Sequence, residues 1–148
     1  LSGFVSTSKE NEELFFKSKN LTLSLIASKN FEEVKKTVEL FFQQNFAVDS
    51  CILESLSDSE LQKLEKVTGL EMNKDSIHMG PLSKEKLDAF FSSESVKSAV
   101  ITVMKLKSGF GLLKMGSNEA TKYLGDGDTT FIEYIRDIIV RVLESKEA

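Results

Sequence analysis

The segment that decides the fold is SAVITVMKLKSGFGLLKM, residues 98–115. Apolar and β-branched side chains fill both halves of this segment, and a Lys-Ser-Gly break at residues 107–109 separates them. Such a pattern predicts two strands, residues 98–106 and 110–115, that pair as an antiparallel hairpin. The chain is therefore expected to contain an antiparallel sheet centred on this hairpin.

The turn of the hairpin sets which residues face each other. A two-residue turn at Ser108-Gly109 would place Lys105 opposite Leu112. One face of the hairpin then carries no charge and is expected to lie under helices: Thr102, Met104, Leu106, Gly111, Leu113 and Met115. The other face carries two lysines and is expected to meet solvent or the rim of a pocket: Ile101, Val103, Lys105, Phe110, Leu112 and Lys114.

Helical patterns flank this hairpin on both sides. Residues 8–28 form a first helix, and Asn30 with Glu33 three residues later marks the start of a second one that ends near Asn45. Thr130, with Glu133 in the same spacing, starts the last helix, which ends near Leu143. The apolar stripe of the second helix is compact, as is typical of a helix packed on a sheet.

The first and last helices are apolar over more than one side. In the first helix, Phe16 and Leu23 lie roughly opposite the line of Leu14, Leu21 and Leu25. In the last helix, further apolar residues widen the stripe of Phe131, Ile135, Ile138 and Val142. Either neighbours within the same domain cover these helices, or one side packs on the domain and the other on a second subunit.

Shorter elements fill the middle of the chain. Residues 48–54 predict a short strand, and Ser57 with Glu60 starts a helix that stops at Gly69. Residues 77–79 are an ambiguous edge strand, Gly80-Pro81 is a break, and Ser83 caps a short helix. The order predicts an α+β fold: one domain over residues 1–148 with an antiparallel sheet and helices mostly on one side, residues 1–28 being an N-terminal helical segment.

Composition excludes several classes of protein. The chain has 148 residues, 41% of them apolar, and a net charge of -4, so nucleic acid is not an expected partner. One cysteine and one histidine exclude an internal disulfide and a two-histidine metal site. No apolar run is long enough to span a bilayer, and the first residues lack the features of a secretory signal. A cytoplasmic location is therefore expected, without membrane association.

The individual candidates for chemistry favour structural interpretations. His78 beside a turn is expected to be half-exposed and hydrogen-bonded, and Cys51 to be a buried small apolar residue. Asp126-Gly127-Asp128 lacks the ligands of a calcium loop and is expected to be a turn. The acidic pairs Glu12-Glu13 and Glu32-Glu33 lie on predicted solvated helix faces. We predict no catalytic residues, no metal site and no cofactor, and hence not an enzyme.

Several segments, in their order along the chain, resemble a known family. They are Glu10-Asn11-Glu12-Glu13-Leu14-Phe15, Leu21-Thr22-Leu23-Ser24-Leu25, Phe31-Glu32-Glu33-Val34, Phe46-Ala47-Val48-Asp49, Gly80-Pro81-Leu82-Ser83 with Leu87 and Phe90-Phe91, Ser98-Ala99-Val100-Ile101, and Gly111-Leu112-Leu113 with Met115-Gly116-Ser117. Together they resemble the DUF484 family of proteobacterial proteins from about residue 11 to residue 143. The resemblance implies a GAF-like (profilin-like) fold, a sheet flanked by terminal helices through which such domains often dimerise. It implies no established activity, and gene neighbourhood in the family points to a tyrosine recombinase as a protein partner.

The better-known GAF chemistries do not match these residues. Asn73-Lys74 is not followed by the Phe and Asp-Glu of cyclic-nucleotide-binding domains, and Cys51 lies inside a predicted strand rather than at an exposed bilin attachment point. Haem would need His78 as an axial ligand in an enclosed pocket.

Two functions remain open on this basis. The first is a non-catalytic GAF-like sensory or scaffolding module that forms a homodimer through its terminal helices, with Phe16, Leu23, Ile132, Ile139 and Leu143 at the interface. The second is a receptor for an unidentified small molecule, with a pocket over the opposite face of the sheet lined by His78, Phe90, Phe91, Ile101, Val103, Phe110 and Leu112.

Overall fold

The predicted hairpin forms the centre of a four-stranded antiparallel sheet. The computed structural model describes residues 8–122 and 129–146. Its strands are β1 (Ser50–Leu56), β2 (Ile77–Pro81), β3 (Ser98–Leu106) and β4 (Gly109–Ser117). Their order in the sheet is β1-β4-β3-β2, so the hairpin strands β3 and β4 are central and the two shorter strands are edges. The hairpin, the strand near residue 50 and the ambiguous edge strand are all confirmed.

The register of the hairpin differs from the one predicted from the turn. Leu106 pairs with Gly109, so the turn residues are Lys107-Ser108, and Lys105 faces Phe110 instead of Leu112. Gly109 is the first residue of β4, and only glycine fits there because its φ is +111 and a Cβ on it would lie 2.5 Å from the carbonyl oxygen of Leu56. The shift amounts to two residues along β4, and side chains alternate with period two, so the face assignments survive it.

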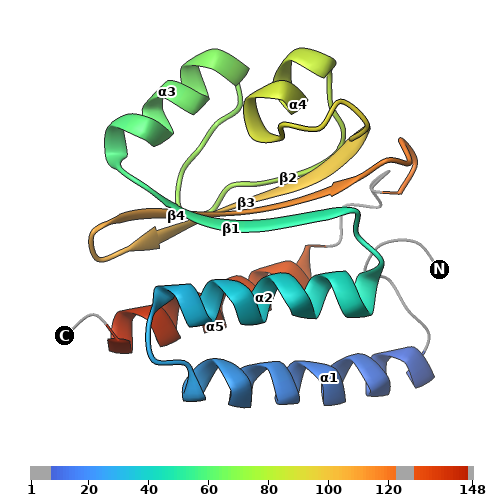
Figure 1. Ribbon diagram of the computed structural model, residues 1–148, viewed down its shortest axis with the longest axis vertical. Helices are drawn as coiled ribbons and strands as arrows, with labels where there is room; N and C mark the ends of the chain where they lie inside the picture. Colours follow the sequence, from blue (N-terminus) through green and yellow to red (C-terminus); the bar gives the residue numbers. More distant parts are fainter. Residues whose placement is uncertain (1–7, 123–128, 147–148) are drawn as a thin grey trace.

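Helices cover both faces of the sheet (Figure 1). They are α1 (Ser8–Ala27), α2 (Phe31–Phe46), α3 (Asp58–Thr68), α4 (Lys84–Phe90) and α5 (Thr130–Lys146). Helices α2 and α5 lie against one face, and α1 lies beneath them as an outer layer, in contact with both. Helices α3 and α4 lie on the opposite face. The α+β class with the terminal helices on one side of the sheet is confirmed.

Local capping explains where several helices begin. The Asn30 side chain accepts a hydrogen bond from the backbone N–H of Glu33, and Ser57 and Glu60 form a reciprocal capping box at α3. Ser83 accepts from the backbone N–H of Lys86 at the start of α4. These bonds satisfy backbone donors that the first helical turn leaves without partners. All three caps were predicted from the sequence.

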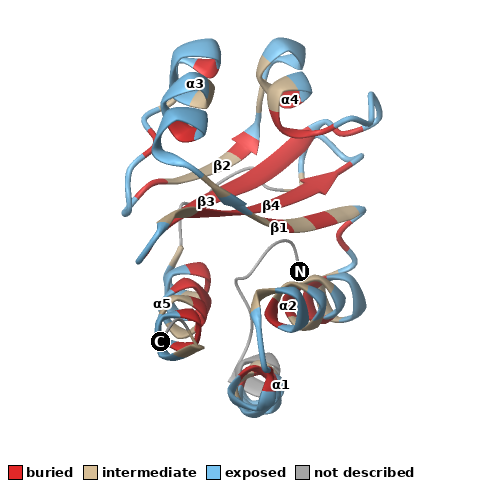
Figure 2. Cartoon of the chain, turned by 60° about the vertical axis from the view of Figure 1, so that its left-hand side comes forward, coloured by how far each residue is buried: buried red, intermediate tan, exposed pale blue. Residues whose placement is uncertain are grey.

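Two hydrophobic clusters lie on the two sides of the sheet (Figure 2). The larger one joins the charge-free face of the hairpin to α1, α2 and α5, as predicted. The smaller one joins the other face to α3 and α4. This second face was expected to meet solvent or the rim of a pocket, and solvent contact is wrong for its centre, since Ile101, Val103 and Leu112 are fully buried.

The predicted break at Gly80-Pro81 is also wrong, because both residues belong to β2. Proline is tolerated there because β2 is an edge strand and ends at Pro81.

Candidate functional site

The predicted pocket residues come together, but as a packed layer. Phe90 and Phe91 at the end of α4 are buried against the three central residues of the second face, and Phe110 packs against the same cluster. His78 lies on β2 opposite Ile101, half-buried, with its Nε2 atom 2.7 Å from the carbonyl oxygen of Glu71. The hydrogen-bonded, half-exposed state expected for His78 is confirmed. The use of this layer as a ligand pocket stays a prediction.

Lys114 joins this layer to the sheet. Only 7% of Lys114 is exposed, and its Nζ donates to the carbonyl oxygen of Phe90 at 2.7 Å. The same ammonium lies 3.3 Å from a carboxylate oxygen of Glu54 and 5.9 Å from the ring centroid of Phe91. Lys114 was expected on a solvent-exposed face, but it can be buried because backbone and carboxylate oxygens replace its water. Its bond to Phe90 links the C-terminal end of α4 to β4.

Cys51 is inert as a nucleophile in the folded protein. Its side chain is buried in the larger cluster, and burial, helped by the nearby Glu39 carboxylate and opposed by Lys35, raises the pKa of the thiol to about 12. Because the thiolate is the reactive form, the thiol is unreactive at neutral pH. The expectation of a buried small apolar side chain is confirmed.

Lys35 and Glu39 on α2 have a structural role at the edge of the sheet. Their side chains form an ion pair of 2.6 Å. Both also reach the edge strand β1: Lys35 donates to the carbonyl oxygen of Leu53, and Glu39 accepts from its backbone N–H. These contacts satisfy outward-facing backbone groups that would otherwise be open to pairing with another chain.

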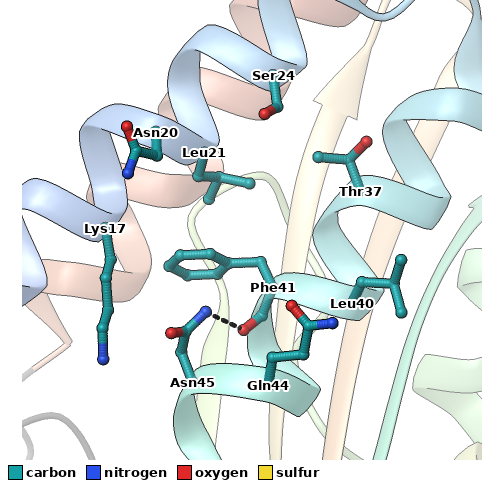
Figure 3. A pocket seen from close by; sticks show the side chains of 9 residues that line it. All are labelled: Lys17, Asn20, Leu21, Ser24, Thr37, Leu40, Phe41, Gln44 and Asn45. Carbon is teal, nitrogen blue, oxygen red and sulfur yellow. Dashed lines mark hydrogen bonds between the residues drawn. The ribbon is translucent and has the colours of Figure 1, made fainter.

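A shallow groove of about 390 Å³ runs between α1 and α2 (Figure 3). Its lining is rich in amides, with Asn20 from α1 and Gln44 and Asn45 from α2. The Asn45 amide nitrogen donates to the carbonyl oxygen of Phe41 at 2.9 Å, a hydrogen bond within its own helix α2. The sequence did not indicate this groove, because it depends on how α1 crosses α2.

A second groove, of about 440 Å³, lies between α5 and the β2–β3 side of the sheet. It contains Arg136, which is 8% exposed and whose Nη1 atom has no hydrogen-bond partner. Sequence reasoning missed this residue. A signal was present, since Arg136 lies between Ile132 and Ile139 at the spacing of one buried helix face.

Four of the seven large apolar side chains that are exposed in the described part of the chain lie on the outward side of α1. Phe15, Phe16, Leu23 and Ile26 are 73%, 64%, 56% and 58% exposed, and we call these four residues the outer stripe. Leu21 and Leu25, on the other side of the helix, are buried against α2 and α5. The two-sided character predicted for α1 is therefore present, and its outer side is exposed in the described part of the chain.

The same prediction is wrong for α5. Ile132, Ile139 and Leu143, proposed as interface residues, are at most 2% exposed and belong to the core of this chain. The reason is the place of α5, which packs on β3 with one side and on α1 and α2 with another. Apart from Tyr134, which is 47% exposed, the wide apolar stripe of α5 is thus covered within the domain, as the alternative interpretation had it.

Other candidates give no site among residues 8–122 and 129–146. Within these ranges no three His, Cys, Asp or Glu side chains are grouped so that they could hold a metal ion, and no helix has the length and hydropathy to cross a bilayer. Glu12, Glu13, Glu32 and Glu33 are exposed, as expected. The predicted turn at residues 126–128 lies outside the described residues.

Comparison with known proteins identifies the family. A comparison with curated protein sequences found no match. The family model described as "Protein of unknown function, DUF484" matches residues 1–146, nearly the whole chain. The resemblance seen in the ordered segments of the sequence is thereby confirmed, and this chain belongs to the DUF484 family.

Proposed function

We propose that this protein is a non-catalytic, GAF-like scaffolding or sensory module that forms a homodimer through the outer stripe of α1. The observation that carries the proposal is the exposure of four large apolar side chains on one side of one helix. Such contiguous apolar surface on a folded chain marks an interaction site. The two reactive residue types point away from catalysis, since the Cys51 thiol is buried and protonated and His78 is bonded to a backbone carbonyl.

The outer stripe is complementary to a second copy of itself. Phe15 and Ile26 lie on one edge of the stripe, and Phe16 and Leu23 lie on the other, roughly 80° around the helix. When two such helices pack antiparallel about a two-fold axis near residue 20, Phe15 faces Ile26 of the other copy and Phe16 faces Leu23. All four apolar residues of each copy are then buried at once.

The charges along α1 favour the same antiparallel direction. Glu12 and Glu13 lie in the N-terminal half of the helix, and Lys29 follows its C-terminal end. In an antiparallel pair, Glu12 of one copy is close to Lys29 of the other, whereas a parallel pair would bring like charges together. Lys19 lies on the midline of the outer stripe near the two-fold axis and opposes association.

The loss of dimer stability expected for a change in the outer stripe follows from the apolar area that the dimer buries. Complete burial of a Leu, Ile or Phe side chain contributes about 1.5–3 kcal/mol, and each residue is buried twice in the dimer. The change Leu23→Glu should therefore cost about 3–6 kcal/mol of dimer stability, which raises the dissociation constant by about 10²- to 10⁴-fold.

Sedimentation equilibrium at micromolar concentration tests the proposal. We expect a dimer for the wild type, a 16.5 kDa monomer for Leu23→Glu, and a dimer for the matched control Val67→Glu. Val67 is suitable because it is 65% exposed on α3, on the other side of the sheet. A monomeric wild type, or a Leu23→Glu variant that remains dimeric, would refute the proposal.

A second variant tests the antiparallel geometry. Lys19→Leu removes the repulsion at the two-fold axis and adds apolar area, so it should tighten the dimer. In a different arrangement that pairs Lys19 with Glu12 of the other copy, the same change would weaken association. A rise in the dissociation constant of Lys19→Leu therefore contradicts the axis near residue 20.

The alternative of a receptor with a pocket over the opposite face has less support. Six of the seven side chains predicted to line that pocket, all except His78, pack in one cluster between the sheet and helices α3 and α4. The homodimeric scaffolding or sensory module is consequently the function that the geometry supports best.

A further inference from the structure

Arg136 is a buried cation with one nitrogen, Nη1, that has no acceptor among the described residues. It lies on the sheet-facing side of α5, 8% exposed, between the fully buried Ile132 and Ile139. Its Nη1 atom is sealed from solvent and has no hydrogen-bond partner. The ion pairs of the described chain join Lys35 to Glu39 and Lys114 to Glu54, and neither includes Arg136.

A sealed guanidinium nitrogen without an acceptor is costly, because its N–H groups have lost water and gained no hydrogen bond in return. The other buried cation of the described chain shows the usual solution, since Lys114 has both a carbonyl and a carboxylate partner. Arg136 differs from it in one further respect: it lines an open groove of about 440 Å³. An acceptor bound in that groove would meet the part of the Arg136 side chain that lines it.

The rim of the groove limits the charge of what can bind. Exposed cations and carboxylates alternate there: Lys74, Lys105 and Arg141 against Asp75, Asp137 and Glu144. The Lys105 ammonium is directed to the hairpin turn, 3.1 Å from the carbonyl oxygen of Gly109 and 4.8 Å from the Phe110 ring centroid. This hydrogen bond leaves Lys105 charged, so the rim carries three cations and three carboxylates. A balanced rim favours a ligand with a positive group beside its negative one over a polyanion.

Met104 and Val140 add apolar surface to the same groove. We infer that this groove binds a small zwitterion of the α-amino-acid class, with the carboxylate on Arg136, the ammonium toward the rim carboxylates and an apolar side chain on Met104 and Val140. A planar guanidinium holds a carboxylate through two parallel hydrogen bonds, which gives both strength and orientation. This inference concerns α5 and the sheet, and it does not depend on the dimer proposed for α1.

Three probes with one carbon skeleton test the inference by thermal shift at constant ionic strength. L-Leucine carries both charges, 4-methylpentanoate lacks the ammonium and 3-methylbutylamine lacks the carboxylate. We expect saturable stabilisation by L-leucine, a weaker effect of 4-methylpentanoate and none of 3-methylbutylamine. No stabilisation by L-leucine, or equal stabilisation by the amine, would overturn the inference, as would a stronger effect of inorganic phosphate.

Variants then assign the effect to Arg136. Arg136→Met keeps the length of the side chain, should melt no lower than the wild type without ligand, and should weaken L-leucine binding by roughly 10- to 100-fold. Lys63→Met removes a cation from the exposed surface of α3 and should bind like the wild type. An Arg136→Met variant that binds L-leucine normally overturns the inference.

A measurement on the wild type guards against a variant that fails to fold. The Nε–Hε resonance of Arg136 in a ¹⁵N NMR spectrum should move on addition of L-leucine and stay in place on addition of 3-methylbutylamine. If L-leucine leaves that resonance unmoved, Arg136 is not the carboxylate partner.

Discussion

The pairing of Gly111 with Met104 makes the register of the central hairpin testable by mutation. The two residues are directly opposite in the structure, whereas a turn at Ser108-Gly109 would have placed Leu106 opposite Gly111. A Cβ atom on residue 111 would lie 2.6 Å from Cγ and 3.0 Å from Sδ of Met104, but 3.5 Å from Cδ1 of Leu106. A methyl group at this position thus collides with Met104 and merely touches Leu106.

These distances set the expected magnitudes. Gly111→Ala overpacks a buried site and should lower the free energy of unfolding by about 1–3 kcal/mol. Met104→Ala alone should cost about 2–5 kcal/mol because it leaves a cavity. In the double variant, the methyl group of residue 111 occupies part of that cavity, so the combined loss should be about 1–2 kcal/mol smaller than the sum. Gly111→Ala with Leu106→Ala should be additive within about 0.5 kcal/mol.

Urea unfolding followed by circular dichroism measures all the free energies required. The protein concentration must be the same throughout, since association would add to the apparent stability. A larger coupling energy for the Leu106 pair than for the Met104 pair would refute the register, and a stabilising Gly111→Ala would refute the packing argument.

Two further predictions concern α2 and the strand beside it. Cys51 loses its proton near pH 9.0 when unfolded and only near about pH 12 when folded. Its contribution to stability is therefore complete below pH 9.0 and is lost as the pH rises toward 12. Cys51→Val should flatten this part of the plot of urea midpoint against pH, and a plot unchanged from the wild type would contradict the burial of the thiol. Glu39→Ala removes the acceptor of the Leu53 amide, so it should lower the free energy of unfolding by about 1–3 kcal/mol and speed amide exchange at Leu53. Glu39→Gln keeps an acceptor and should restore slow exchange. Equal exchange rates in both variants would show that the contact does not protect the edge strand.

Features that depend on near neighbours in the chain were predictable from the sequence. The caps at Asn30, Ser57 and Ser83 form as their spacing indicates, because a cap involves residues only three apart. The division of the hairpin residues between its two faces was also predicted correctly, since alternation with period two survives a shift of two residues.

The candidate site depended much more on distant contacts. The sequence indicated that α1 and α5 each have a wide apolar surface, but not which parts the chain itself would cover. Burial of Ile139 and exposure of Leu23 follow from one arrangement, in which α5 lies between the sheet and α1 while α1 is the outermost layer. Helical periodicity predicts how much apolar surface a helix has, but it does not predict which element will pack on that surface.

What the sequence determined by itself is therefore the set of elements, their caps and the two faces of the hairpin, because these follow from spacing along a single segment. The tertiary structure alone decided that Lys114 is buried with partners and that Nη1 of Arg136 is buried without one among the described residues. The physical reason is that the cost of burying a charge depends on the acceptors that other segments bring within hydrogen-bond distance, and those segments are remote in the chain.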